Sequence, residues 1–113
     1  MDLRYTKNLT KESADIYIYD EIGYGVNAGG FVRELNWLID ESGVSLVNVR
    51  INSPGGSVFD GLGIFAAITN SKVPVHTYID GVAASAAGFI AMAGKKRYMV
   101  SHGQLMMHNV SAG

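Results

Sequence analysis

Residues 79–94 read IDGVAASAAGFIAMAG and indicate how the rest of the chain is organised. The apolar run Val75–Ile79 predicts a short strand that ends in a turn at Gly81. Small residues follow, and the apolar run up to Gly94 predicts a helix. Ser85 stands where strand gives way to helix, so we expect its hydroxyl to lie in the open beside helical N–H groups that lack acceptors. Ser85 is therefore a candidate nucleophile, although a serine before a helix is often only an N-cap.

The composition describes a small folded protein and excludes several classes. The chain has 113 residues, 48% of them hydrophobic, which is enough for one domain and high for a free monomer, so we expect contacts between copies. The net charge is −1 without a basic stripe, so nucleic acid is not an expected partner. The absence of cysteine excludes disulfides and thiol catalysis. No signal peptide or membrane span is recognisable, so a cytoplasmic protein without a membrane partner is expected.

Hydrophobic periodicity predicts alternating strands and helices. The expected strands cover 14–19, 46–51, 75–79, 97–100 and 104–108, and the expected helices cover 28–41, 58–70 and 85–93. This order predicts an α/β fold with right-handed crossovers and a mainly parallel sheet. Residues 1–13 are polar and are expected to form a flexible arm. The glycine-rich loops 52–56 and 80–84 both follow strands, so they are expected side by side at one edge of the sheet.

Two further groups could act with the serine. Residues 52–57 read NSPGGS, and their paired glycines could present a backbone N–H to an oxyanion. The alternative is an ordinary strand-to-helix turn with Ser53 or Ser57 as its cap. His108 ends an apolar strand and could take a proton from Ser85, although a single histidine is more often structural. The three histidines are widely spaced and no carboxylate pattern accompanies them, so no metal is expected.

Three segments together carry a family resemblance: INSPGGSVFDGLGIFAAI, IDGVAASAAGFIAMAG and LMMHNV. In this order and at these gaps they resemble the Clp protease proteolytic subunit family, the ClpP peptidases. They look closest to its phage and prophage branch, the head-maturation proteases. The resemblance covers 14–113 and implies a ClpP/crotonase-type fold of repeated β-β-α and βαβ units with a mainly parallel sheet. It also implies that 14–113 is the N-terminal part of a peptidase domain.

The resemblance also assigns roles. Ser85 matches the nucleophile and His108 the general base, while the N–H groups of Gly56 and Ala86 match the oxyanion donors. Residues 56–59 and 109–112 match strands that clamp an extended peptide. The implied substrate-binding residues are Gly55, Gly56, Ser57, Val58, Asn109 and Val110. The implied function is a serine endopeptidase subunit without a cofactor, acting on polypeptides in ATP-dependent proteolysis or capsid maturation. Its expected partners are further copies in a ring, and an AAA+ unfoldase or phage capsid proteins.

The chain departs from the family pattern at the acid of the triad. That acid lies well downstream of the histidine, and this sequence stops five residues after His108. Neither Asp60 nor Asp80 matches its position. We therefore expect a fragment of a longer protein that is a poor enzyme alone. Two alternatives remain open: a catalytically inactive assembly component, and a crotonase-type acyl-CoA enzyme in which paired N–H donors hold a thioester oxygen.

Overall fold

Three parallel strands form the centre of the sheet: β2 (Ser13–Ile18), β3 (Leu46–Ser53) and β4 (Val75–Ala84). The structure is a computed structural model that describes residues 1–107. The short strand β1 (Thr6–Lys7) lies antiparallel to β2, and both β5 (Arg97–Met99) and β6 (Gln104–Met106) lie parallel to β4. The strand order is β1-β2-β3-β4-β5, with β6 paired to the far end of β4. The sheet is therefore mainly parallel, with one antiparallel edge.

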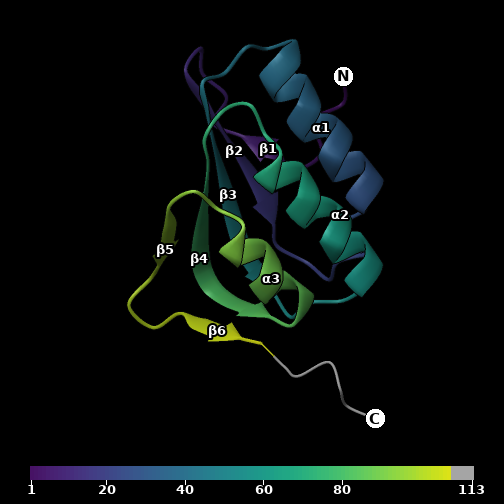
Figure 1. Ribbon diagram of the computed structural model, residues 1–113, viewed down its shortest axis with the longest axis vertical. Helices are drawn as coiled ribbons and strands as arrows, with labels where there is room; N and C mark the ends of the chain where they lie inside the picture. Colours follow the sequence, from purple (N-terminus) through teal and green to yellow (C-terminus); the bar gives the residue numbers. More distant parts are fainter. Residues whose placement is uncertain (108–113) are drawn as a thin grey trace.

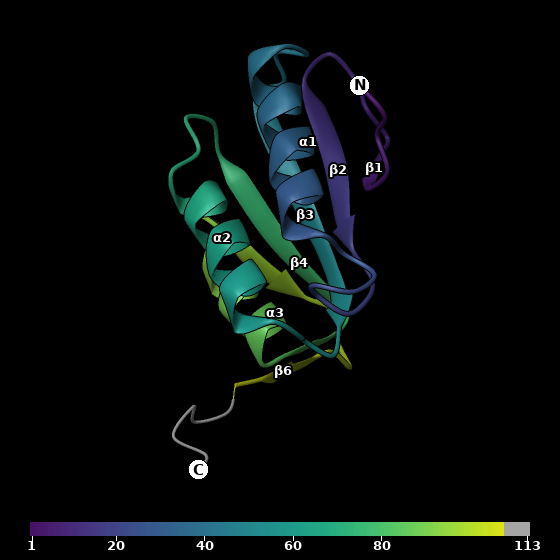
Figure 2. The same ribbon diagram turned by 90° about the vertical axis from the view of Figure 1, so that its right-hand side faces the viewer.

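The helices α1 (Ala28–Asp40), α2 (Val58–Thr69) and α3 (Ala86–Met92) lie along the sheet (Figure 1, Figure 2). The chain adds β2, β3 and β4 in sequence order, so right-handed crossovers place the connecting helices on one face. Each of the two longer helices begins at a side-chain cap. Asn27 Oδ1 accepts from Gly30 N at 2.8 Å, and Ser57 Oγ accepts from Asp60 N at 3.3 Å. Within residues 1–107, no helix is long and apolar enough to cross a membrane.

The core lies between the helices and one face of the sheet. Alternate residues of the central strands are buried there, as a pleated strand requires. They pack against the apolar stripe of α1 and the inner faces of α2 and α3; the main members are Ile16, Ile18, Phe31, Leu35, Leu38, Val47, Val49, Ile51, Ile64 and Ile90. The opposite face is polar and aromatic and only half-buried; it includes Asp15, Tyr17, Asn48, Arg50, His76 and Tyr78. The sheet therefore has an apolar face that packs against the helices, called the core face below, and a polar and aromatic face, called the outer face.

The predicted fold class is confirmed, and the eight predicted elements occur in the predicted order, but the short strand β1 was not predicted. The expected turn at Gly81 is wrong, because β4 continues as a strand through that glycine to Ala84. The glycine instead marks an irregularity in the pairing of β4 with β3. Such a break in a ladder bends a strand without ending it. The serine therefore sits at the end of a long bent strand and not after a loop.

The expectation that 1–13 forms a flexible arm is wrong for its middle part. Glu34 of α1 is 2% exposed, and its carboxylate accepts three hydrogen bonds from this segment. The donors are Arg4 N at 3.1 Å, Tyr5 N at 2.8 Å and the hydroxyl of Thr6 at 2.7 Å. A buried carboxylate needs such donors, since burial without them is costly. Residues 4–6 are thus tied to α1 by a buried carboxylate.

Candidate active site

Ser85 occupies a sharp bend between β4 and α3. Its backbone has φ 56° and ψ −122°, a conformation that residues with a side chain rarely adopt. The bend is held on one side by the bond from Ser85 N to Met106 O at 2.7 Å, and on the other by the bond from Gly88 N to Ser85 O at 2.9 Å. The hydroxyl makes no capping hydrogen bond to α3. This observation favours the nucleophile interpretation over the N-cap interpretation.

The glycine loop after β3 lies directly against this bend. Gly55 and Gly56 have φ of 106° and 141°, which glycine alone adopts readily. A Cβ atom on Gly55 would lie 2.6 Å from Ala84 O and 2.9 Å from Ser85 Cβ. The expected loop over 80–84 is wrong, since these residues belong to β4, but the glycine loop does contact the end of that strand at the carboxyl edge of the sheet.

The loop is fixed from its other side by the segment after β2. Ile22 N donates to Gly55 O at 2.8 Å, and Ser57 N donates to Ile22 O at 2.9 Å. Buried Ser53 adds two bonds, since its hydroxyl donates to Asp20 O at 2.7 Å and accepts from Gly55 N at 3.2 Å. Sequence reasoning missed Ile22, because it is a single apolar residue in a glycine-rich loop and belongs to no periodic pattern.

These contacts leave two N–H groups beside the serine without partners. Within the described part of the chain, neither Gly56 N nor Ala86 N donates a hydrogen bond. Gly56 belongs to the loop that touches Ser85, and Ala86 is the first residue of α3, where N–H groups lack intrahelical acceptors. Unpaired backbone donors held next to a hydroxyl are the arrangement that stabilises a tetrahedral oxyanion.

An apolar pocket of about 210 Å³ lies next to Ala86. It is lined by Val58, Gly61 and Leu62 of α2 and by Ala86 and Phe89 of α3. A Cβ atom on Gly61 would lie 2.9 Å from Ala86 Cβ, so the glycine lets the two helices approach. The pocket is large enough for an apolar side chain of a bound polypeptide.

The comparisons with known proteins identify the family. The sequence profile of the Clp protease family matches residues 3–113. The chain belongs to the Clp protease family. The ATP-dependent Clp protease proteolytic subunit 2 of Synechococcus sp. is 39% identical over 89 residues, which are 77% of this chain and 45% of that protein. Subunit 1 of Prochlorococcus marinus is 40% identical over 88 residues, 76% of this chain and 45% of that protein. The chain thus spans about half the length of these curated relatives.

A solved Clp structure supports the fold. The crystal structure of the ClpP protease catalytic domain from Plasmodium falciparum superposes with a TM-score of 0.75 at 32% identity. The match covers 84% of this chain and 53% of that chain. The mainly parallel α/β architecture expected from the sequence is therefore confirmed as a Clp protease fold.

Two of the residues expected to clamp a peptide take another conformation. The family resemblance implied a strand over 56–59, but Val58 begins α2 in the structure because Ser57 caps that helix. Ser57 N is already bonded to Ile22 O, so it is not free to pair with a peptide. Val58 instead contributes its side chain to the apolar pocket. Three further expected site residues, His108, Asn109 and Val110, lie outside the described residues.

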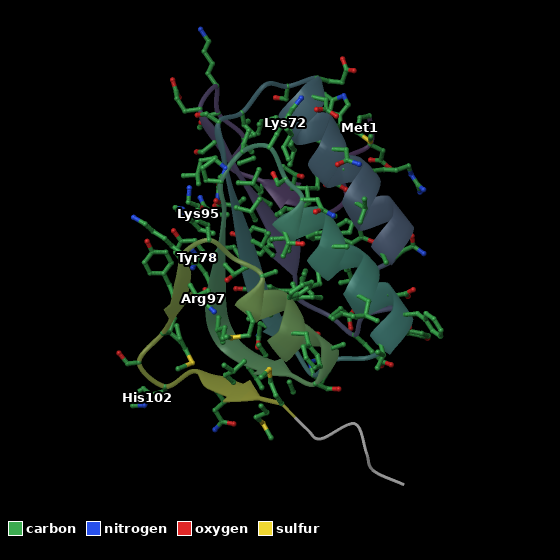
Figure 3. The ribbon with its side chains drawn as sticks, in the orientation of Figure 1. Met1, Lys72, Tyr78, Lys95, Arg97 and His102 are labelled. Carbon is green, nitrogen blue, oxygen red and sulfur yellow. The ribbon has the colours of Figure 1, made fainter. Side chains whose placement is uncertain are left out.

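The two described histidines are separate from the bend at Ser85. His76 lies on the outer face of β4, against the edge of Tyr98. Partial burial and the nearby ammonium groups of Lys96 and Lys95 lower the pKa of His76. His102 is exposed in the turn between β5 and β6 (Figure 3). Within residues 1–107, no group of three histidine or carboxylate side chains could hold a metal ion.

The aspartates near the loops have structural partners. Asp60 lies in the first turn of α2, where a carboxylate is favourable. The carboxylate of Asp80 accepts hydrogen bonds from Arg50 Nη2 at 2.6 Å and from the Tyr19 hydroxyl at 2.6 Å. Burial, together with the bond to Asp80, raises the pKa of Tyr19 to about 12, so the phenol stays protonated as the donor. This cluster lies on the outer face of the sheet.

Proposed function

We propose that this chain supplies the nucleophile and oxyanion donors of a serine endopeptidase subunit that cleaves extended polypeptides. The observation that carries the proposal is the bend at Ser85, whose uncapped side chain lies with its Cβ against a glycine loop that has an unpaired N–H group. A hydroxyl placed at a strained turn, next to backbone donors and an apolar pocket, has the parts that acyl transfer requires. Family membership supports the same chemistry.

The proposed reaction follows from these positions. Ser85 Oγ attacks the peptide carbonyl while His108 takes its proton, and the N–H groups of Gly56 and Ala86 hold the negative oxygen. His108 then gives the proton to the leaving amine, which leaves an acyl ester on Ser85. Water, deprotonated by the same histidine, hydrolyses this ester. An aspartate further along a longer chain would orient His108, in a Ser-His-Asp mechanism.

The proposal extends to substrate contacts and assembly. The pocket of Val58, Gly61, Leu62, Ala86 and Phe89 would take an apolar side chain of the substrate. Asn109 and Val110 would pair with the substrate backbone, as the family resemblance implies, whereas both backbone groups of Gly55 are already bonded to Ser53 and Ile22. Many exposed apolar side chains support burial against other parts of a ring, among them Phe59, Leu62, Met92, Met99, Leu105 and Met107.

The proposed biological setting follows from the family resemblance. It comprises a cytoplasmic homo-oligomeric ring, an AAA+ unfoldase or capsid proteins as partners, and either ATP-dependent proteolysis or phage head maturation. The proteins compared above are described as ATP-dependent Clp protease subunits and a ClpP catalytic domain, which favours the first of these two roles.

A fluorophosphonate probe tests the chemistry. The chain should gain one adduct on Ser85 by intact mass, and Ser85→Ala should gain none. His108→Ala should label about 10²- to 10⁴-fold more slowly, because it lacks the general base. Ser101→Ala, which removes an exposed turn serine, is the control and should label like the parent. A folded parent protein without an adduct, or an adduct that persists in Ser85→Ala, would overturn the proposal and leave the assembly role as the better interpretation.

A further inference from the structure

The pairing of β3 with β4 breaks just before the serine. Ile51 of β3 pairs with Ile79 of β4, and the next pair is Ser53 with Ala83. The register therefore advances by two residues on β3 and by four residues on β4. Asp80 and Gly81 lie in this break, and β4 curves there beneath α3 (Figure 1). Before the break β4 pairs with β5, and after it β4 pairs with β6. The contacts at this break set the direction of the final residues of β4. They therefore also set the position of Ser85.

On one side, the side chain of Asn52 bridges the break. Its Oδ1 accepts from Val82 N at 3.1 Å, which replaces a ladder bond that the irregular register removes. The amide also packs over Gly81, since a Cβ atom there would lie 2.5 Å from Asn52 Oδ1 and 3.0 Å from its Cγ. A side chain of β3 therefore fixes the first residue that follows the break.

On the other side of the break, Asp80 accepts hydrogen bonds from residues of two neighbouring chain segments. Its carboxylate accepts from Arg50 Nε at 3.0 Å and Nη2 at 2.6 Å, and from the hydroxyl of Tyr19, which follows β2. The Asp80 side chain is only 12% exposed. The Arg50 guanidinium lies 4.3 Å from the centre of the Tyr78 ring, which limits its movement. The residue at the start of the break is thus tied to both β2 and β3.

We propose that Asn52 and Asp80 are positioning residues that place Ser85 against the Gly55–Gly56 loop. Ser85 follows Val82 by three residues, and Gly55 already lies in contact with Ala84 and Ser85, so a small shift of β4 changes the distance from the hydroxyl to the oxyanion donors. Both residues lie on the outer face of the sheet, away from the apolar pocket, and act through the β4 backbone. Misplacement of a reacting group by about 1 Å can slow a reaction 10²-fold. This inference rests on the proposed peptidase function.

The test uses the full chain and measures two quantities separately: the maximal rate constant for labelling of Ser85 and the affinity for the fluorophosphonate probe. Asn52→Ala should lower the maximal labelling rate constant of Ser85 about three- to tenfold, the effect of one lost hydrogen bond, with unchanged affinity for the fluorophosphonate. Asn52→Asp keeps an acceptor oxygen and should restore the rate. Tyr19→Phe removes one donor from Asp80 and should slow labelling in the same direction.

Asn48→Ala is the matched control. Asn48 lies on the same strand and face as Asn52 and also makes a cross-strand bond, from Nδ2 to Asp15 Oδ1 at 3.0 Å, but it is remote from the break. It should lower the melting temperature without changing labelling. The inference is overturned if Asn52→Ala labels at the parental rate, or if Asn48→Ala slows labelling equally.

Amide hydrogen exchange makes the test independent of reactivity. Asn52→Ala should speed exchange at Val82 and Ser85 while Val47 and Val49, on regular parts of β3, stay protected. If the parent protein does not label, the peptidase proposal fails, and this exchange pattern still decides whether Asn52 holds the bend. Unchanged exchange at Val82 and Ser85 would overturn the positioning role.

Discussion

A Gly56→Ala variant should lose both stability and reactivity towards the fluorophosphonate. Gly56 has φ 141°, and a Cβ atom there would overlap Ile22 O and lie 2.8 Å from Ile22 N. The loop must move away from Ile22, which breaks the bonds that fix it. Strained backbone and lost bonds together should cost about 2–4 kcal/mol in urea unfolding. If Gly56 N is an oxyanion donor, labelling should also fall about 10²- to 10³-fold.

Gly63→Ala provides the control for this variant. Gly63 lies in α2, and no heavy atom beyond its own stretch of the helix lies within 4 Å of the added Cβ. Alanine is a better helix former than glycine, so this variant should gain about 0.5–1 kcal/mol and label normally. An unfolding midpoint for Gly56→Ala that equals the parental one would contradict the contact between the loop and Ile22.

A Glu34→Ala variant should destabilise the protein by about 2–4 kcal/mol, because it removes the buried carboxylate that accepts three hydrogen bonds from residues 4–6. The carboxylate of Glu34 holds Arg4 N, Tyr5 N and the Thr6 hydroxyl against α1. Its loss should release β1 from β2, so the amides of Tyr5 and Tyr17, which bonds to Tyr5 O, should exchange faster. Urea unfolding gives the energy, and hydrogen exchange with NMR shows the location.

Glu41→Ala is the matched control, since Glu41 is an exposed glutamate at the end of the same helix. Its change in unfolding free energy should stay within about 0.5 kcal/mol. Equal effects of the two substitutions would show that charge, and not the buried contacts of Glu34, accounts for the loss.

The sequence predicts the layers of the fold because local periodicity and burial agree. Phe31, Leu35 and Leu38 recur at helical spacing and all face the core. The contact between the glycine loop and Ser85 was also predictable, since parallel strands bring their carboxyl ends to one edge. These features depend on residues close in sequence or on a general rule of topology.

The parts that could not be predicted depend on single contacts between distant residues. Glu34 interrupts the apolar stripe of α1. No pattern in the nearby sequence shows that the groups that donate hydrogen bonds to its carboxylate lie about 30 residues earlier in the chain. Gly81 has the composition of a turn, but Asn52 from another strand keeps it extended. Tyr19 and Asp80 are 61 residues apart. Such pairs are fixed by three-dimensional packing, which overrides local preference.

At position 85, the residue that the proposed reaction needs differs from the residue that would make the fold most stable. With φ 56° and ψ −122°, Ser85 holds a shape that glycine adopts freely and that costs other residues about 1–3 kcal/mol. Selection for thermal stability alone would therefore favour the substitution Ser85→Gly. That substitution would remove the hydroxyl. Serine is retained only under selection that rewards the hydroxyl itself.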